Sequence, residues 1–299
     1  MFATGLLWIP FTLLAAAGQT ARNAMQRELT RALGTVGATH VRFLFGFPFA
    51  VVFLAGVVMA TGLPLPTPPL AFWPWVLLGS GAQILATALM LATMNDRSFV
   101  VTIAYIKTEA VQAALFGLIF LGDKVTLLMA FAILIATAGV VAMSLKGKDV
   151  AAGGIRPVLL GLLSGGMFAV SAVGYRGAIL SLGLPNFVLA ATFTLTVGLL
   201  LQAGLLTLYL ALRDRAVLGA IARAWRPSLF AGFMGATASQ FWFLAFALTS
   251  VANVRTLALV EVLFAQAISF FVFKQATTRR EALGMTLIVL GVALLIWVQ

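Results

Sequence analysis

An apolar stretch at residues 98–121 is long enough to cross a lipid bilayer as one helix, yet it carries Lys107 and Glu109 near its midpoint. About 20 apolar residues span the hydrocarbon core, and an ionisable side chain at its centre costs about 3 kcal/mol unless it faces protein or water. A second stretch, at residues 253–273, likewise places Glu261 near its middle. Both stretches predict membrane helices whose polar side chains point into a bundle, where such residues are candidates for function.

The composition agrees with this interpretation. Hydrophobic residues make up 62% of the 299 residues and charged residues 9%, which is more apolar surface than a soluble domain of this size can bury. The chain has no cysteine and a single histidine, His40, so we expect no disulfide, metal site or other cofactor. The net charge of +11 lies mostly in short loops between apolar runs. The membrane accounts for such loops, and we therefore expect no nucleic-acid partner.

The apolar runs predict an all-α integral membrane protein with about ten transmembrane helices of ~20 residues each. The run that begins at Gly5 has no basic segment before it and no cleavage site after it, so it is expected to be a span and not a removed signal peptide. A basic loop at 213–226 is expected to contain an amphipathic turn. The expected spans are 5–18, 36–60, 73–93, 98–121, 127–145, 157–180, 186–212, 227–248, 253–273 and 282–298.

The two halves of the chain can be aligned with each other. Residues 125–145 match residues 277–297, and in one register Gly139 falls on Gly291 and Glu109 on Glu261. The glycine-containing linker 146–156 then divides the chain into a first repeat, 1–145, and a second repeat, 157–299. Since each repeat would hold an odd number of spans, the second would be inverted relative to the first. Transporters of this build keep their substrate site near the middle of the membrane, between the repeats.

Polar residues at spacings of three and four mark the faces that would line such a site. The candidates from the first repeat lie on three helices, and the second repeat adds a glutamine that falls opposite Gln83 and the acid that falls on Glu109. The candidate substrate-binding residues are Gln19, Asn23, Gln83, Tyr105, Glu109, Gln112, Gln240 and Glu261.

Other roles for these residues remain open. Gln19 and Asn23 are equally compatible with a helix end that emerges among lipid headgroups, and the other glutamines with hydrogen bonds between helices worth about 1 kcal/mol each. Either acid could pair with Lys107, Arg255 or a hydroxyl group. Lys107 projects roughly opposite Glu109 on the same helix, so a direct pair between them is not expected. Glu109 is the favoured working group, because Glu261 has only apolar neighbours along its own helix.

Several short motifs resemble the EamA repeat of the drug/metabolite transporter superfamily. In the second half they are Thr249-Ser250-Val251-Ala252, the segment from Leu257 to Glu261, Leu283-Gly284 and Leu290-Gly291-Val292; in the first half they are Arg42-Phe43 and Leu121-Gly122-Asp123. Val262 stands where the family often has proline, and Lys274-Gln275 where it often has Gly-Glu. The resemblance covers nearly the whole chain. It implies two inverted five-helix repeats and an exporter or exchanger of small metabolites, without naming the substrate.

We therefore expect a secondary transporter that exports small metabolites, such as amino acids or drug-like compounds, across a bacterial inner membrane by alternating access. Its partners would be the substrate, membrane lipid and protons as a candidate coupling ion, in a monomer or a homodimer. An exchanger of anionic metabolites is the alternative, suggested by the intramembrane cations Arg22, Arg42, Lys107 and Arg255. We expect no enzyme, because no Ser/His or paired-Asp constellation and no nucleotide-binding loop lies within the spans.

The sequence gives two conflicting predictions of orientation. Lysine and arginine residues concentrate in alternate loops, such as those at 146–156 and 213–226, whereas the opposite loops hold little beyond Lys124. Because positive residues in short loops stay in the cytoplasm, this pattern places both termini outside. The family resemblance implies the reverse.

Overall fold

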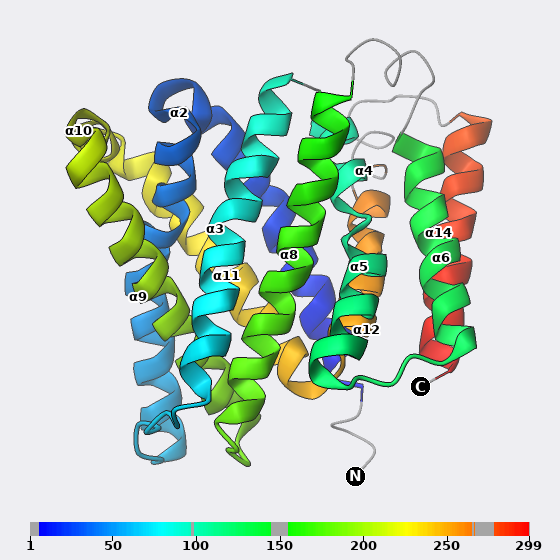
Figure 1. Ribbon diagram of the computed structural model, residues 1–299, viewed down its shortest axis with the longest axis horizontal. Coiled ribbons are helices and arrows are strands. Elements are labelled where there is room, and N and C mark those ends of the chain that lie inside the picture. Colours follow the sequence, from blue (N-terminus) through cyan, green and yellow to red (C-terminus); the bar gives the residue numbers. More distant parts are fainter. Residues whose placement is uncertain (1–5, 97–98, 145–154, 265, 267–277, 299) are drawn as a thin grey trace.

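The computed structural model describes residues 6–96, 99–144, 155–264, 266 and 278–298. Throughout these residues the regular structure is helical, as the sequence predicts, and the helices stand side by side in one bundle (Figure 1). Some residues that enter the sequence predictions lie outside the described residues: residues 5 and 98, residues 146–154 of the linker, residues 267–273 of the expected ninth span, and residues 274, 275 and 277. Within the described part of the chain, six helices are long and apolar enough to cross a membrane: Met25–Thr61, Phe72–Asn95, Arg156–Ser181, Phe187–Arg213, Trp225–Leu248 and Arg279–Trp297.

The first helix, α2 (Trp8–Thr61), is two helical segments that meet at Gly34. Gly34 has φ 67° and ψ 176°, a backbone conformation that glycine adopts without the steric penalty of a Cβ. The first segment therefore continues well beyond residue 18, where its first apolar run ends. As a result Arg22, Asn23 and Gln26 are buried inside the bundle and do not emerge among headgroups.

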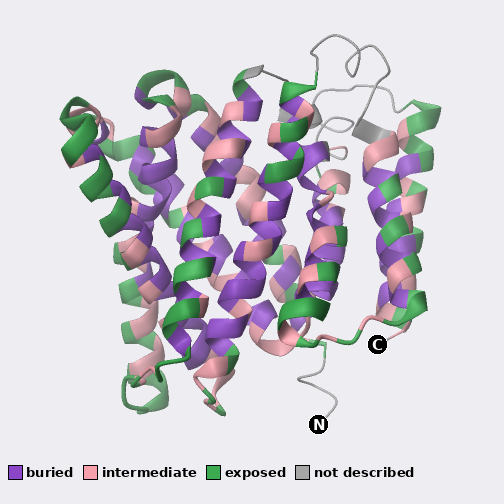
Figure 2. Cartoon of the chain, viewed as in Figure 1, coloured by how far each residue is buried: buried purple, intermediate pink, exposed green. Residues whose placement is uncertain are grey.

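Most of the other helices begin and end within a few residues of the predicted limits. They are α3 (Phe72–Asp96), α6 (Leu127–Ser144), α8 (Arg156–Ser181), α9 (Phe187–Arg213), α11 (Trp225–Leu248) and α14 (Arg279–Trp297). The short helix α10 (Arg215–Arg223) forms in the basic loop where an amphipathic turn is expected. Buried residues lie mainly where helices face one another, and exposed ones on the outside of the bundle (Figure 2).

The stretch at 98–121 differs from the continuous helix that the sequence predicts. It consists of α4 (Phe99–Ile106), α5 (Glu109–Phe116) and the π-helical turn η1 (Gly117–Leu121), with Lys107 and Thr108 interrupting the α-helical pattern. At this point Thr108 N donates to Tyr105 O and Ala110 N to Lys107 O, each at 3.4 Å. In the second half, α12 (Val251–Leu257) passes directly into the 3₁₀ turn η2 (Ala258–Val260) before Glu261. Both stretches therefore leave regular α-helix next to their acids.

Helices α6 and α14 pack closely through glycines. A Cβ at Gly139 would lie 2.6 Å from Gly284 O and 2.9 Å from Ile288 N, and a Cβ at Gly291 would lie 2.7 Å from both Ala132 O and Ala136 N. The separation along the chain from Gly139 to Gly291 equals that from Ala132 to Gly284 and that from Ala136 to Ile288. The contact is therefore reciprocal, as in an interface between two symmetry-related copies.

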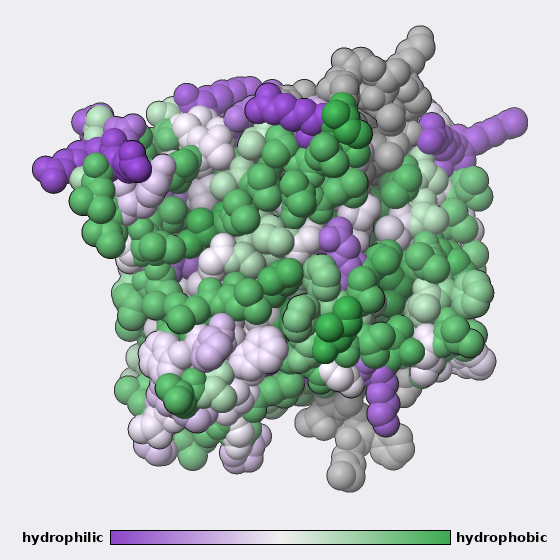
Figure 3. Space-filling view, in the orientation of Figure 1, coloured by the Kyte–Doolittle hydropathy of each residue, from purple (hydrophilic) through white to green (hydrophobic). Residues whose placement is uncertain are grey.

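The two ends of the bundle differ in character. Helix α2 begins and α14 ends at the lower end in Figure 1, whereas α10 and the bend of α2 lie at the upper end. Apolar side chains cover the middle of the face seen in Figure 3, and hydrophilic ones gather mainly along its upper edge. An apolar belt with charge collected at one end is the surface expected of a protein embedded in a bilayer.

Candidate functional site

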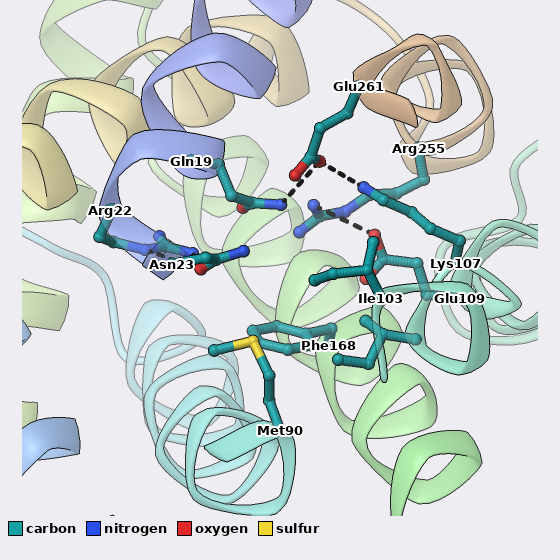
Figure 4. A pocket seen from close by; sticks show the side chains of 11 residues that line it. Gln19, Arg22, Asn23, Met90, Ile103, Lys107, Glu109, Phe168, Arg255 and Glu261 are labelled. Atoms are coloured by element: carbon teal, nitrogen blue, oxygen red, sulfur yellow. Dashed lines mark hydrogen bonds and ion pairs between the residues drawn. The ribbon is translucent and has the colours of Figure 1, made fainter. Parts of the chain in front are cut away.

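A small cavity lies between the first segment of α2, α3, the interrupted stretch α4–α5, α8 and α12. Its free volume is about 10 Å³, about the space of one water molecule. The site is thus closed in this conformation, with charged side chains on one side and apolar ones on the other (Figure 4). The lining residues are Gln19, Arg22, Asn23, Met90, Ile103, Ile106, Lys107, Glu109, Phe168, Arg255 and Glu261.

The first of two buried ion pairs joins Lys107 to Glu261. Lys107 Nζ lies 2.5 Å from Glu261 Oε2, and both side chains are almost completely buried. Gln19 Nε2 donates to the same oxygen at 3.4 Å, and Thr20 Oγ1 donates to Glu261 Oε1 at 3.0 Å. Both oxygens of Glu261 therefore accept hydrogen bonds, as a buried carboxylate requires. The donors come from the first segment of α2 and from the break between α4 and α5.

The second ion pair joins Arg255 to Glu109, with Arg255 Nη1 3.6 Å from Glu109 Oε1. Glu109 occupies the first turn of α5, where the helix dipole favours a negative charge. The Arg255 guanidinium also lies over the rings of Trp242, at 4.7 Å, and Phe246, at 5.3 Å. Trp242 in turn donates from Nε1 to Gln19 Oε1 at 3.1 Å. Gln19 and Trp242 thus link the two ion pairs into one network.

Each acid therefore pairs with a cation from the other stretch. Glu109 and Lys107 do not pair with each other, as their opposite projections on one helix predict. Glu261 is better supplied with donors than its own helix suggests, because Lys107, Gln19 and Thr20 all come from the first half of the chain. Ion pairs buried in this way are strongly destabilised when one partner is removed, typically by 3–5 kcal/mol. The two pairs accordingly hold the halves together at the cavity.

Two further arginines are buried close to the cavity. Arg22 is 1% exposed and Arg42 is 2% exposed, and their stems pack against Gly235 of α11, since a Cβ there would lie 3.4 Å from carbons of both. Arg22 donates from Nε and Nη2 to Asn23 Oδ1, at 3.3 and 2.7 Å. Arg42 donates from Nη1 to Thr87 Oγ1 at 3.1 Å. Their described hydrogen bonds thus go to an amide and a hydroxyl group.

Two of the four glutamines expected at the site, Gln83 and Gln240, tie helices together elsewhere in the bundle. Gln83 Oε1 accepts from Tyr175 Oη at 3.2 Å and from Gln202 Nε2 at 2.9 Å, which ties α3 to α8 and α9. Gln240 Nε2 donates to Thr192 Oγ1 at 2.7 Å, which ties α11 to α9. Neither residue lines the cavity in this conformation. Both make the hydrogen bonds between helices that the sequence left open as the alternative.

Tyr105 and Gln112 face α8 and not the cavity. Tyr105 is buried, its ring packs against Gly161, and its hydroxyl has no hydrogen-bond partner among the described atoms. Gln112 Nε2 donates to Thr108 Oγ1 at 3.3 Å and to Leu162 O at 3.4 Å. Of the eight candidates, Gln19, Asn23, Glu109 and Glu261 are brought together.

The site also includes residues that the candidate set omits. The sequence marks Lys107 and Arg255 as intramembrane cations, but their pairing depends on how the halves pack. The apolar side, made by Met90, Ile103 and Phe168, has no mark in the sequence, because these side chains resemble ordinary core residues.

Another ion pair lies at the lower end of the bundle. Arg176 of α8 donates from Nη1 to Phe246 O and Thr249 O, both at 2.5 Å, and its Nη2 lies 3.5 Å from Asp123 Oδ1. Asp123 follows η1, and Thr249 caps the end of α11. Two of the motifs noted in the sequence, which contain Asp123 and Thr249, are thus joined by a single arginine.

Comparison with known proteins identifies the fold but no family. The sequence matches no family model, and it matches no curated protein. Among solved structures 28 chains match. One of them, a crystal structure, superposes with a TM-score of 0.72 over 99% of this chain and 96% of the other, at 17% sequence identity. At that identity the likeness shows a shared fold alone, and the function has to be inferred from the site.

Proposed function

We propose that this protein is a secondary transporter that moves small metabolites across a membrane by alternating access, with export as its direction. The observation that carries the proposal is the pair of crossed ion pairs, Lys107–Glu261 and Arg255–Glu109, around a closed cavity inside an apolar bundle. Buried charges in membrane segments are expensive, and they are kept where a pathway or binding site needs them. Helices that lose regular structure beside such charges are typical of transporter binding sites.

The proposal includes two inverted five-helix repeats, 1–145 and 157–299, in about ten spans of ~20 residues. It is supported by the reciprocal packing of Gly139 and Gly291. Glu109 and Glu261 are also separated along the chain by the same number of residues as Gly139 and Gly291. The motif resemblance to the EamA repeat points the same way. In this arrangement each repeat can close one side of a fixed central site as the halves rock.

Opening the cavity has to separate at least one ion pair, since the closed site has room for about one water molecule. Glu261 has three donors, whereas the ion pair of Glu109 with Arg255 spans 3.6 Å. Separating Glu109 from its partner therefore breaks weaker interactions than separating Glu261 from its donors. This difference favours Glu109 as the group that changes partner during transport and Glu261 as its structural counterpart. A carboxylate that loses its cation can bind a proton, so protons are the candidate coupling ion.

Flux into proteoliposomes tests this proposal. We expect Glu109→Gln and Glu261→Gln to reduce the flux driven by an imposed pH gradient by at least about tenfold, because each change leaves a buried cation unneutralised. Glu28→Gln is the matched control, since Glu28 is exposed and pairs only with Arg31 at the surface. Full gradient-driven flux in both folded variants would remove the two acids from the transport mechanism.

An exchanger of anionic metabolites is the second candidate. It is favoured by one observation, the two buried arginines Arg22 and Arg42 whose described contacts include no carboxylate within ion-pair distance. An exchanger requires a substrate on the far side of the membrane. Flux that depends on preloading the liposomes with a counter-substrate would identify this mode, and flux into empty liposomes would exclude it.

A further inference from the structure

Positive charge exceeds negative charge around the closed cavity. Among the described side chains of this region, Arg22, Arg42, Lys107 and Arg255 are at most 5% exposed, and so are Glu109 and Glu261. Two carboxylates cannot neutralise four cations, even though both lie within electrostatic range of Arg22. An uncompensated charge in a low-dielectric interior is unstable, and a bound ion of opposite sign is one way to compensate it.

Arg22 is the cation best placed to meet such an ion. It lines the cavity, and Figure 4 shows its side chain extending from α2 toward the space where Lys107, Arg255 and the two acids gather. Its Nε and Nη2 are held by Asn23 Oδ1, which fixes the plane of the guanidinium, while its Nη1 is buried without a hydrogen-bond partner among the described atoms. A fixed guanidinium with a free N–H suits a carboxylate or a phosphate oxygen.

Other buried arginine groups are less available. Arg255 is paired with Glu109 and lies over the Trp242 and Phe246 rings, although its Nε has no hydrogen-bond partner among the described atoms. Arg42 does not line the cavity, and its Nη1 is bound to Thr87. Arg42 instead raises the positive potential behind Arg22, since both stems pack against Gly235.

We propose that Arg22 binds the anionic group of the transported substrate, which is a small organic anion whose apolar body lies against Met90, Ile103 and Phe168. This inference rests on the proposed transport function and names its substrate class. In the closed conformation the cavity is too small for such a molecule. The anion enters when the halves separate. Its charge then offsets the positive charge that Glu109 and Glu261 do not neutralise.

Thermal unfolding of the purified protein in detergent tests the inference without requiring flux. The probes share one ring and differ in charge: benzoate and phenyl phosphate are anions, benzamide is neutral and benzylamine is a cation. We expect the unfolding temperature to rise with at least one of the anions and not with benzamide or benzylamine, because only a ligand that binds the folded state stabilises it. The two anions distinguish a carboxylate site from a phosphate site.

Variants assign the binding to Arg22. Arg22→Met should weaken binding of the stabilising anion by at least about tenfold, Arg22→Lys by less because the charge remains, and the exposed control Arg31→Met not at all. Without ligand, Arg22→Met should unfold at the wild-type temperature or above, because it removes an uncompensated charge. Lys107→Met should unfold at a lower temperature, because it leaves Glu261 without its cation.

Three results would overturn the inference: stabilisation by benzamide equal to that by either anion, wild-type anion binding in Arg22→Met, or a loss of stability in Arg22→Met as large as in Lys107→Met. Flux separates this inference from the proposed function. Transport of neutral or cationic compounds that does not depend on Arg22 would leave the transporter in place and remove the anion site. Anion binding through Arg22 without any flux would keep the anion site and remove the proposed transport function.

Discussion

Individual residues at the site act through partners that are distant in the chain. Lys107 and Glu261 lie in different halves, yet they make the shortest ion pair of the cavity. Neither side chain is open to bulk water in the closed conformation, because both are almost completely buried. The energetic role of each residue is therefore defined only together with its partner.

A double-mutant cycle measures this coupling. We expect Lys107→Met to destabilise the protein by about 3–5 kcal/mol, because it leaves a buried carboxylate unpaired. Adding Glu261→Gln should recover much of that loss, since the second change removes the orphaned charge. Chemical unfolding of the two single variants and the double variant in the same detergent provides the comparison. Additive losses would mean that the two side chains are not coupled.

At the scale of elements, close helix contacts depend on glycine at particular positions. Gly139 of α6 is buried against α14, and a Cβ there would lie 2.6 Å from a backbone oxygen of that helix. Gly204 of α9 is exposed, and a Cβ there would meet nothing within 4 Å. The two glycines therefore provide a matched pair for testing whether the α6–α14 contact is as tight as the structure shows.

We expect Gly139→Ala to destabilise the protein by about 1–3 kcal/mol, because a backbone oxygen cannot move away without shifting a helix. Gly204→Ala should leave the stability unchanged or raise it by up to about 1 kcal/mol, since alanine loses less backbone entropy in a helix. Unfolding temperatures of both variants in one detergent check the prediction. Equal effects of the two substitutions would show that α6 and α14 do not pack this closely.

At the scale of the whole molecule, α2 begins and α14 ends at the same end of the bundle (Figure 1). The described basic residues of α10 and its flanks, among them Arg213, Arg215 and Arg223, belong to the opposite end. Because short basic loops stay in the cytoplasm, this distribution favours an outward location for both termini. The motif resemblance implies the reverse, and the fold itself is compatible with either orientation.

Reporter fusions at the C-terminus decide the orientation. We expect a fusion of alkaline phosphatase after Gln299 to be active and a fusion of a fluorescent protein to be dark, because the phosphatase functions only outside the cytoplasm. Phosphatase fused after Ala220, in the basic loop, serves as the control and should be inactive. Bright fluorescence at the C-terminus with no phosphatase activity would reverse the assignment.

The sequence by itself determined that this is an all-α protein with membrane-spanning helices, and it located most helix limits to within a few residues. It could do so because apolar length and turn residues are local properties of the chain. It also singled out Glu109 and Glu261, since a carboxylate in an apolar run is conspicuous wherever the helix packs. The recurrence of Gly139 at Gly291 was likewise visible in the sequence, although its reciprocal contact was not.

Only the tertiary structure decided which polar residues meet. Gln83 and Gln240 occupy the polar positions that a site would use, but their hydrogen bonds run to Tyr175, Gln202 and Thr192 away from the cavity. A helical face defines a direction and not a partner, because the partner depends on how the helices are rotated and packed. Lys107 lies in the interruption between α4 and α5, and its partner Glu261 likewise belongs to a segment far along the chain, which the sequence alone does not indicate.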